Sequence, residues 1–258
     1  MVSTLRIAAL FCSAIVAFGL PVALLVWWHG KTKATYFDAL VGALIFLVFA
    51  MVLEQILHSF VLKTSIVSKP WAFVLYGSFA AGVFEETGRY VGFRFFMKKK
   101  QAKEDAIMYG IGHGGMESIL IAGVSLVVSI IAVLAANAGH TDNQTFAQTA
   151  RVVAQSPIST LFASGVERAV AICLHIALSV LVFLSVKRAG LWWMYPLAIL
   201  FHAGVDSIAM LYRYHILKVG VMGLEGIVAL ATFLVCLFAF RWYRNDRGNA
   251  QSVRITEA

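Results

Sequence analysis

The sequence is poor in charged residues. Aspartate, glutamate, lysine and arginine make up 13% of its 258 residues, whereas soluble domains carry roughly a quarter. Hydrophobic residues account for 60%, and the mean hydropathy is +0.83. This balance excludes a soluble globular protein and predicts a chain that lies mostly within a lipid bilayer.

Cysteine is scarce as well. Cys12, Cys173 and Cys236 lie in apolar stretches at no ligand spacing, so we predict neither a disulfide framework nor a thiolate metal site. The sequence also lacks HExxH, Gly-x-Ser-x-Gly and GxxxxGK[ST] motifs. Zincin, serine-hydrolase and P-loop functions therefore have no support.

Long apolar runs, in contrast, are abundant. A hydrocarbon core about 30 Å thick needs roughly 20 apolar helical residues to cross it, and the runs are continuous rather than alternating as in membrane strands. We predict an all-α, polytopic transmembrane bundle of about seven or eight helices, with one transmembrane domain over 1–242 and a polar cytoplasmic tail over 243–258. The expected spans are 7–28, 37–62, 71–97, 106–136, 158–186, 190–212 and 216–240.

Basic residues are distributed unequally between the two sides that seven spans imply. Twelve of the 21 lysines and arginines fall on the side of the C-terminus and six on the other side. Such an excess marks the cytoplasmic side, so we predict a bacterial cytoplasmic (inner) membrane protein with its N-terminus outside. The net charge of +8 then reports topology rather than binding to nucleic acid. The residues on the expected cytoplasmic side are Lys31, Lys33, Lys98, Lys99, Lys100, Lys103, Lys187, Arg188, Arg241, Arg244, Arg247 and Arg254.

Ionisable residues inside the expected spans are the feature most indicative of function. A charge at the bilayer centre costs roughly 2.5–3.5 kcal/mol on insertion scales. The expected spans nevertheless contain seven acidic residues and only three arginines, an excess of four negative charges if every acid is ionised. Some acids are therefore protonated, some histidines are charged, or a cation is bound. The residues are Glu54, Glu85, Glu86, Glu117, Glu167, Asp206 and Glu225; His58, His113, His175 and His202; and Arg89, Arg94 and Arg168.

Two adjacent glutamates lie one helical turn before an arginine. Glu85 and Arg89 are at i, i+4, and Glu86 and Arg89 are at i, i+3, so either acid can pair with the guanidinium. The unpaired glutamate would then have the properties of a general base. The alternative is a structural ion pair between helices, although one glutamate would suffice for it.

Two His-x-x-x-acid pairs share the form His-small-Gly-apolar-acid. His113 and Glu117, like His202 and Asp206, lie on one helix face, where an acid can orient an imidazole or both side chains can reach one metal. Glu167 and His175 are expected to support this site. Glu54, His58 and Glu225 are left outside it.

These motifs resemble those of the CAAX-protease and bacteriocin-processing (CPBP) superfamily of intramembrane proteases. The resemblance covers about residues 36–210 and is strongest to the YhfC-like membrane peptidases of bacteria, on Phe84–Arg89, Gly112–Glu117 and His202. It implies that Glu85 or Glu86 activates water with His113, and that His202 and Asp206 stabilise the oxyanion. Arg89 is one residue closer to the glutamates than in the CAAX branch, Tyr109 replaces a phenylalanine, and Asp206 stands where asparagine is frequent. Asp206 and the added Glu117 favour a metal site.

We therefore expect a membrane-embedded endopeptidase that hydrolyses a membrane-associated peptide or protein, with Arg89 holding the glutamate pair. The catalytic candidates are Glu85, Glu86, Arg89, His113, His202 and Asp206. The sequence assigns no definite cofactor and leaves a divalent metal such as zinc open, with His113, Glu117, His202 and Asp206 as its candidate ligands. Glu86→Ala and His113→Ala are expected to fold and to be inert. The rival functions are a proton- or ion-coupled secondary transporter and a non-catalytic membrane binding protein; a transporter would string the ionisable residues along a path rather than gather them.

Overall fold

The structure is a computed structural model that describes residues 1–140 and 142–246. None of these residues lies in a β-strand, and the predicted all-α fold is confirmed. The predicted tail, 243–258, lies outside the described residues from 247 onward. The elements are α1 (Thr4–Thr32), α2 (Tyr36–Val48), η1 (Phe49–Glu54), α3 (Gln55–Val61), η2 (Ser65–Ser68), α4 (Pro70–Val91), η3 (Gly92–Phe96), α5 (Lys103–Glu117), η4 (Ser118–Gly123), α6 (Val124–Asn137), α7 (Gln144–Gln155), α8 (Ile158–Lys187), α9 (Met194–Arg213) and α10 (Val221–Asn245).

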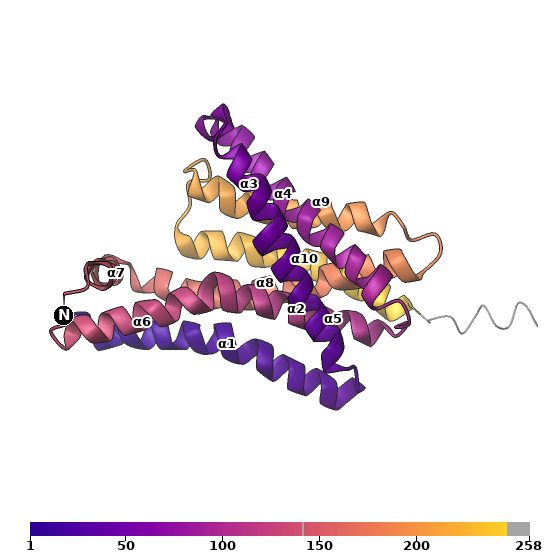
Figure 1. Ribbon diagram of the computed structural model, residues 1–258, viewed down its shortest axis with the longest axis horizontal. Helices are drawn as coiled ribbons and strands as arrows, with labels where there is room; N and C mark the ends of the chain where they lie inside the picture. Colours follow the sequence, from indigo (N-terminus) through magenta and orange to yellow (C-terminus); the bar gives the residue numbers. More distant parts are fainter. Residues whose placement is uncertain (141, 247–258) are drawn as a thin grey trace, which may run out of the picture.

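Six helices in the described part of the chain are long and apolar enough to cross a membrane: Thr4–Thr32, Tyr36–Val61, Lys103–Asn137, Ile158–Lys187, Met194–Arg213 and Val221–Asn245. The seventh predicted span corresponds to α4, which has 22 residues but carries Glu85, Glu86 and Arg89. It runs obliquely beside α2–α3 across the other helices (Figure 1). The two ends of the described chain lie at opposite ends of the bundle (Figure 1).

The expected cytoplasmic segments gather at one end of the bundle, here called the basic end (31–38, 97–105, 187–193 and 241–246). Lys187 Nζ donates to the carbonyl oxygens of Met97 and Lys98 at 2.8 and 3.1 Å. Arg188 binds both carboxylate oxygens of Asp246 at 2.7 and 2.8 Å. The sequence segments predicted to share a side therefore lie together.

Helix α5 lies close against its neighbours because it is rich in glycine. A Cβ on Gly112 would lie 2.0 Å from the Ala39 carbonyl oxygen in α2, and a Cβ on Gly42 would lie 2.2 Å from the Tyr109 carbonyl oxygen. A Cβ on Gly110 would meet the Ile176 Cα in α8 at 2.7 Å. Small residues permit this backbone approach in membrane bundles, and it brings the ionisable side chains of α5 and α8 within contact distance.

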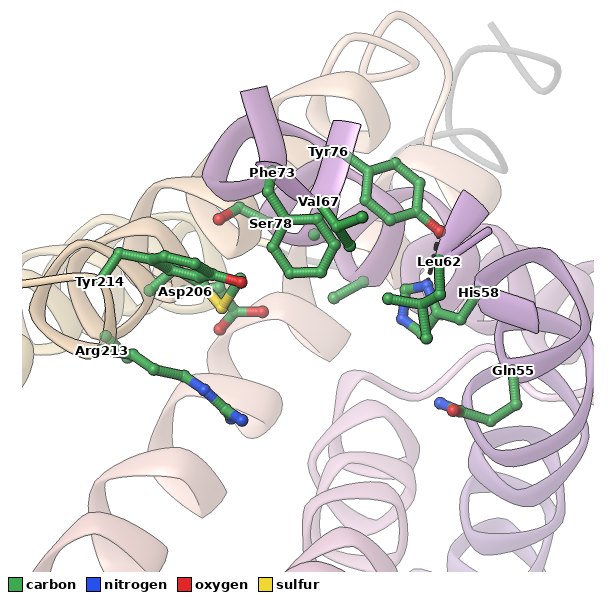
Figure 2. A pocket seen from close by; sticks show the side chains of 14 residues that line it. Gln55, His58, Leu62, Val67, Phe73, Tyr76, Ser78, Asp206, Arg213 and Tyr214 are labelled. Carbon is green, nitrogen blue, oxygen red and sulfur yellow. Dashed lines mark hydrogen bonds between the residues drawn. The ribbon is translucent and has the colours of Figure 1, made fainter. Parts of the chain in front are cut away.

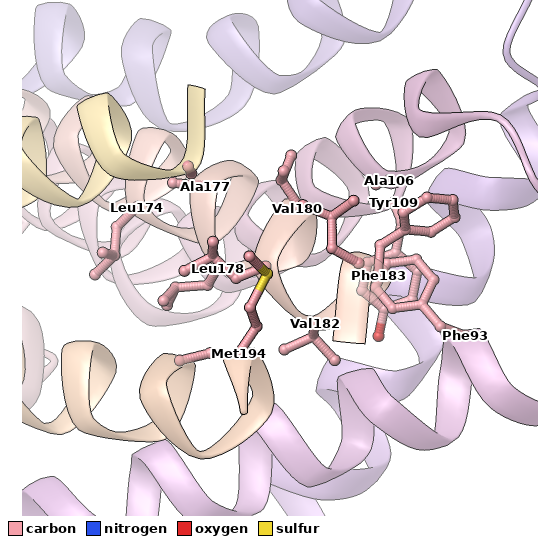
Figure 3. Packing of buried hydrophobic residues seen from close by; sticks show 14 of the residues in the cluster. Phe93, Ala106, Tyr109, Leu174, Ala177, Leu178, Val180, Val182, Phe183 and Met194 are labelled. Atoms are coloured by element: carbon pink, nitrogen blue, oxygen red, sulfur yellow. The ribbon is translucent and has the colours of Figure 1, made fainter. Parts of the chain in front are cut away.

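An apolar cluster that includes Phe93, Tyr109 and Phe183 packs inside the bundle (Figure 3). Phe93 lies with its ring centroid 4.5 Å from that of Tyr109 and 5.5 Å from that of Phe183, and all three side chains are fully buried. These residues are about one turn after Arg89, one turn before His113 and two turns after His175. The cluster therefore separates the charged interior from the basic end.

The segment 137–157 differs from the polar loop that its composition suggests. It contains α7, an amphipathic helix that begins with Asn143 accepting a hydrogen bond from the Phe146 N–H and buries Ala150 and Val153. These two side chains pack in a cluster with α1 and α6. The many polar residues of α7 hid the short apolar stripe that attaches it.

Candidate active site and metal centre

Glu85 and Glu86 point into different surroundings. Glu86 is fully buried, and both of its carboxylate oxygens accept hydrogen bonds from Arg89 Nη1, at 2.5 and 2.6 Å. Glu85 has no arginine within ion-pair distance among the described residues; it accepts a hydrogen bond from His113 Nε2 at 2.9 Å. Arg89 thus neutralises the charge of Glu86, and the Glu85 carboxylate remains available to bind a metal or accept a proton.

His202 on α9 is oriented by Glu86. Its Nδ1 lies 2.7 Å from Glu86 Oε1, and its Nε2 lies 3.5 Å from Asp206 Oδ2 on the next helical turn. Because Glu86 is paired with Arg89 as a carboxylate, Nδ1 donates and the lone pair of the neutral imidazole is on Nε2. That lone pair is directed away from Glu86 and toward the side of Asp206.

His175 on α8 is held in the same way by a different carboxylate. Its Nε2 contacts Glu117 Oε2, and its Nδ1 lies 3.0 Å from Arg89 Nη2. A guanidinium only donates, so Nδ1 carries the lone pair and the proton is on Nε2, which faces Glu117 Oε2. Glu117 is fixed in turn by Arg168, whose Nη1 lies 3.0 Å from its Oε1, while Arg168 Nη2 contacts Glu167 at 2.6 Å.

Three side chains can converge on one cation. Glu85, His175 and His202 each offer a ligand atom within 4.8 Å of the other two. One carboxylate with two imidazoles is a donor set of catalytic zinc sites, and both imidazoles have their other nitrogen on a carboxylate, as metal-bound histidines usually do. Glu85 and Asp206 are moreover without an arginine partner among the described residues, so a divalent cation would balance their charges. The donor chemistry fits a metal, which His175 Nδ1 would bind in exchange for its present contact with Arg89 Nη2.

A small cavity of about 110 Å³ gives this site room for a reactant. Glu85, Glu117, His175, His202 and Asp206 line it. The Asp206 side chain is 36% exposed, whereas that of His202 is 3% exposed, so Asp206 stands at the mouth of the cavity and His202 at its base. Both a water molecule and a carbonyl group could meet the metal donors here.

The structure gathers most of the residues that the sequence singles out, with altered partners. His113 contacts Glu85 rather than Glu117, its partner by spacing, and its Nδ1 is buried with no hydrogen bond among the described residues. Of the expected ligands His113, Glu117, His202 and Asp206, only His202 belongs to the group within 4.8 Å. His175, expected in a supporting place, belongs to it instead.

The tyrosine in the motif before His113 occupies an apolar place. The hydroxyl of Tyr109 is buried and has no hydrogen-bond partner among the described residues. A Cβ on Gly92 would lie 3.0 Å from the Tyr109 ring and 3.1 Å from its hydroxyl, so the glycine makes room for it. Nothing in the structure explains why this position carries a tyrosine hydroxyl in place of phenylalanine.

Comparison with known proteins places the chain in a family. Residues 15–229 match the family described as YhfC intramembrane metalloprotease. The chain belongs to the YhfC family. It is similar to the "Uncharacterized membrane protein YhfC" of Bacillus subtilis (strain 168), with 36% identity over 248 residues that cover 91% of this chain and 95% of the relative. No solved structure shows a significant match. The YhfC family description includes a metal and proteolysis, which the predicted motifs had suggested.

Proposed function

We propose that this YhfC-family chain is an intramembrane metallopeptidase that hydrolyses a peptide bond of a membrane-associated substrate. The observation that carries the proposal is the convergence of Glu85, His175 and His202 at the base of a cavity whose mouth holds Asp206. A transporter would distribute such groups along a path across the bundle. The predicted place in the CPBP superfamily is part of the same proposal.

Glu85, His175 and His202 would hold the metal, which when bound polarises a carbonyl group and activates water. Glu86 and Glu117 orient the two imidazoles, and Arg89 keeps Glu86 ionised. His113 donates to Glu85 and fixes its carboxylate. Asp206 accepts the proton of the attacking water and delivers it to the leaving amine, because its carboxylate lies at the mouth of the cavity and lacks a strong partner.

The apolar cluster of Phe93, Tyr109 and Phe183 excludes water from the basic-end side of the site. Exclusion of bulk water strengthens the electrostatic interactions of the buried groups. No covalent intermediate is expected, since no serine or cysteine among the described residues lines the small cavity and the Thr232 hydroxyl there has no hydrogen-bonded base among them; water is therefore the nucleophile.

The test is metal analysis of the full chain, purified in mild detergent without chelator, beside a His175→Ala/His202→Ala variant. We expect near-stoichiometric zinc or another divalent metal in the parent and at least a tenfold loss in the variant, as for weakened ligation. His29→Ala is the matched control, because His29 lies at the basic end and bonds the Ala34 carbonyl oxygen; it should retain the metal.

Activity is measured on a peptide library by mass spectrometry, with Glu85→Gln as the inert variant. Cleavage by the parent that Glu85→Gln abolishes supports the proposal. A metal-free parent that moves protons across proteoliposomes in a Glu85-dependent manner would contradict it and favour the transporter.

A further inference from the structure

A larger cavity of about 720 Å³ adjoins the proposed active site (Figure 2). Asp206 and Ala209 line both this cavity and the small one that contains Glu85, His175 and His202. The volume lies within the range of about 300–1,000 Å³ typical of ligand pockets. The large cavity therefore adjoins the reacting groups beside Asp206 and Ala209.

One wall of this cavity is a continuous face of α9. Asp206, Ala209, Met210 and Arg213 line it at the spacing of a single helical stripe, and Tyr214 follows directly after the helix. The stripe leads from the active site to the C-terminal end of α9, near the 62–69 connection and opposite the basic end (Figure 1).

The opposite wall includes His58 and Tyr76, and Glu54 lies behind His58; the proposed active site does not use these residues. Glu54 Oε1 lies 3.2 Å from His58 Nε2, and His58 Nδ1 lies 2.6 Å from the Tyr76 hydroxyl oxygen (Figure 2). With the proton of His58 on Nε2, which faces the Glu54 carboxylate, Nδ1 accepts a hydrogen bond from the Tyr76 hydroxyl. The phenol oxygen of Tyr76 then has lone pairs available for an N–H group in the cavity.

Asp206 and Arg213 place opposite charges at two points along the cavity. Arg213 points into it (Figure 2), is exposed, and has no acidic partner among the described residues. Asp206 and Arg213 are seven residues apart, or about 10.5 Å along the helix. An extended peptide rises about 3.3 Å per residue, so about three residues would fit between a bond at Asp206 and a group at Arg213.

We propose that the large cavity binds an extended polypeptide segment of the substrate, and that Arg213 selects an acidic side chain about three residues from the cleaved bond. This inference rests on the proposed peptidase function. The substrate segment runs along α9, and the Tyr76 hydroxyl oxygen accepts a hydrogen bond from one of its backbone N–H groups. The segment enters from the end of the bundle opposite the basic end. Arg213 is a specificity-determining residue outside the reacting atoms.

The test uses a randomised peptide library with amidated C-termini, so that any carboxylate selected is a side chain. For cleavage by the full-length parent, we expect aspartate and glutamate to be enriched roughly threefold at that position, as an exposed ion pair allows. Arg213→Glu should select lysine and arginine there instead. Lys218→Glu, an exposed change at the same end outside the cavity, should leave the preference unchanged.

A second arm separates this inference from the peptidase function. The same library is bound to immobilised Glu85→Gln protein and to its Arg213→Glu derivative, and the retained peptides are sequenced. Acid selection that Arg213→Glu reverses supports the cavity as a peptide site, even if the parent cleaves nothing and the peptidase proposal fails. Cleavage or binding with the same preference in parent and Arg213→Glu, or no selection in either arm, overturns it.

Discussion

Neighbouring residues have opposite roles in this site because of what surrounds each one. Glu86 has Arg89 and His202 as partners inside the bundle, whereas Glu85 faces the cavity. Removing one member of a buried ion pair leaves an uncompensated charge, which costs about 3–5 kcal/mol. The expectation that Glu86→Ala folds normally therefore needs revision: the structure gives Glu86 a positioning role.

At the residue scale we predict that Glu86→Ala lowers the free energy of unfolding by about 3–5 kcal/mol. Glu86→Leu/Arg89→Met, which removes both charges, should recover most of this loss, since apolar replacement of a buried pair is often neutral. The measurement is thermal unfolding in detergent followed by tryptophan fluorescence. Glu85→Gln is the neighbouring control and should unfold like the parent; a Glu86→Ala protein as stable as the parent would contradict the assignment.

At the scale of elements, helical irregularities surround the site. The π-helical segment η1 ends at Glu54, η3 begins three residues after Arg89, and η4 follows Glu117 directly. Such segments occur frequently at functional sites because they re-aim side chains. The glycines before η4 serve a different purpose, since α5 stays helical through them and they allow its contacts with α2 and α8.

We predict that Gly112→Ala separates α2 from α5 and disturbs His113, the next residue. The added methyl group would lie 2.0 Å from the Ala39 carbonyl oxygen, and such overpacking costs about 1–3 kcal/mol. Activity and thermal stability should both fall. Gly226→Ala in α10 is the matched control, because nothing lies within 4 Å of its Cβ; it should be stabilising by about 0.5–1 kcal/mol. Equal effects of the two changes would refute the close-packing argument.

At the scale of the whole molecule, the basic end and the mouth of the large cavity lie at opposite ends of the bundle. If the basic end faces the cytoplasm, as the charge bias predicts, the proposed substrate segment enters from the outer side of the membrane. The orientation therefore decides which side of a membrane protein this chain can process.

The orientation is tested by cysteine labelling in intact cells, in a background with Cys12, Cys173 and Cys236 replaced by alanine. A membrane-impermeant maleimide should label Ser65→Cys without permeabilisation and Lys99→Cys only after it, since both positions are exposed at opposite ends. The reverse pattern would place the cavity on the cytoplasmic side.

The sequence by itself determined that this chain is a membrane helical bundle with a buried polar site. Continuous apolar runs can satisfy their backbone groups in lipid only as helices, and buried charges such as Glu85, Glu86, His113 and His202 are too costly to persist without a use. Helical spacing also predicted that Arg89 pairs with one of the two glutamates.

Only the tertiary structure decided which partners these residues have. Spacing relates residues on one helix, but Glu117 contacts His175 and Arg168 on α8, and His113 contacts Glu85 on α4. Those contacts depend on the relative rotation and close approach of α4, α5, α8 and α9, which glycines and side-chain packing set. The sequence pattern does not specify how the helices are rotated and packed against one another. His175 is therefore recognised as a candidate metal ligand only from the tertiary structure.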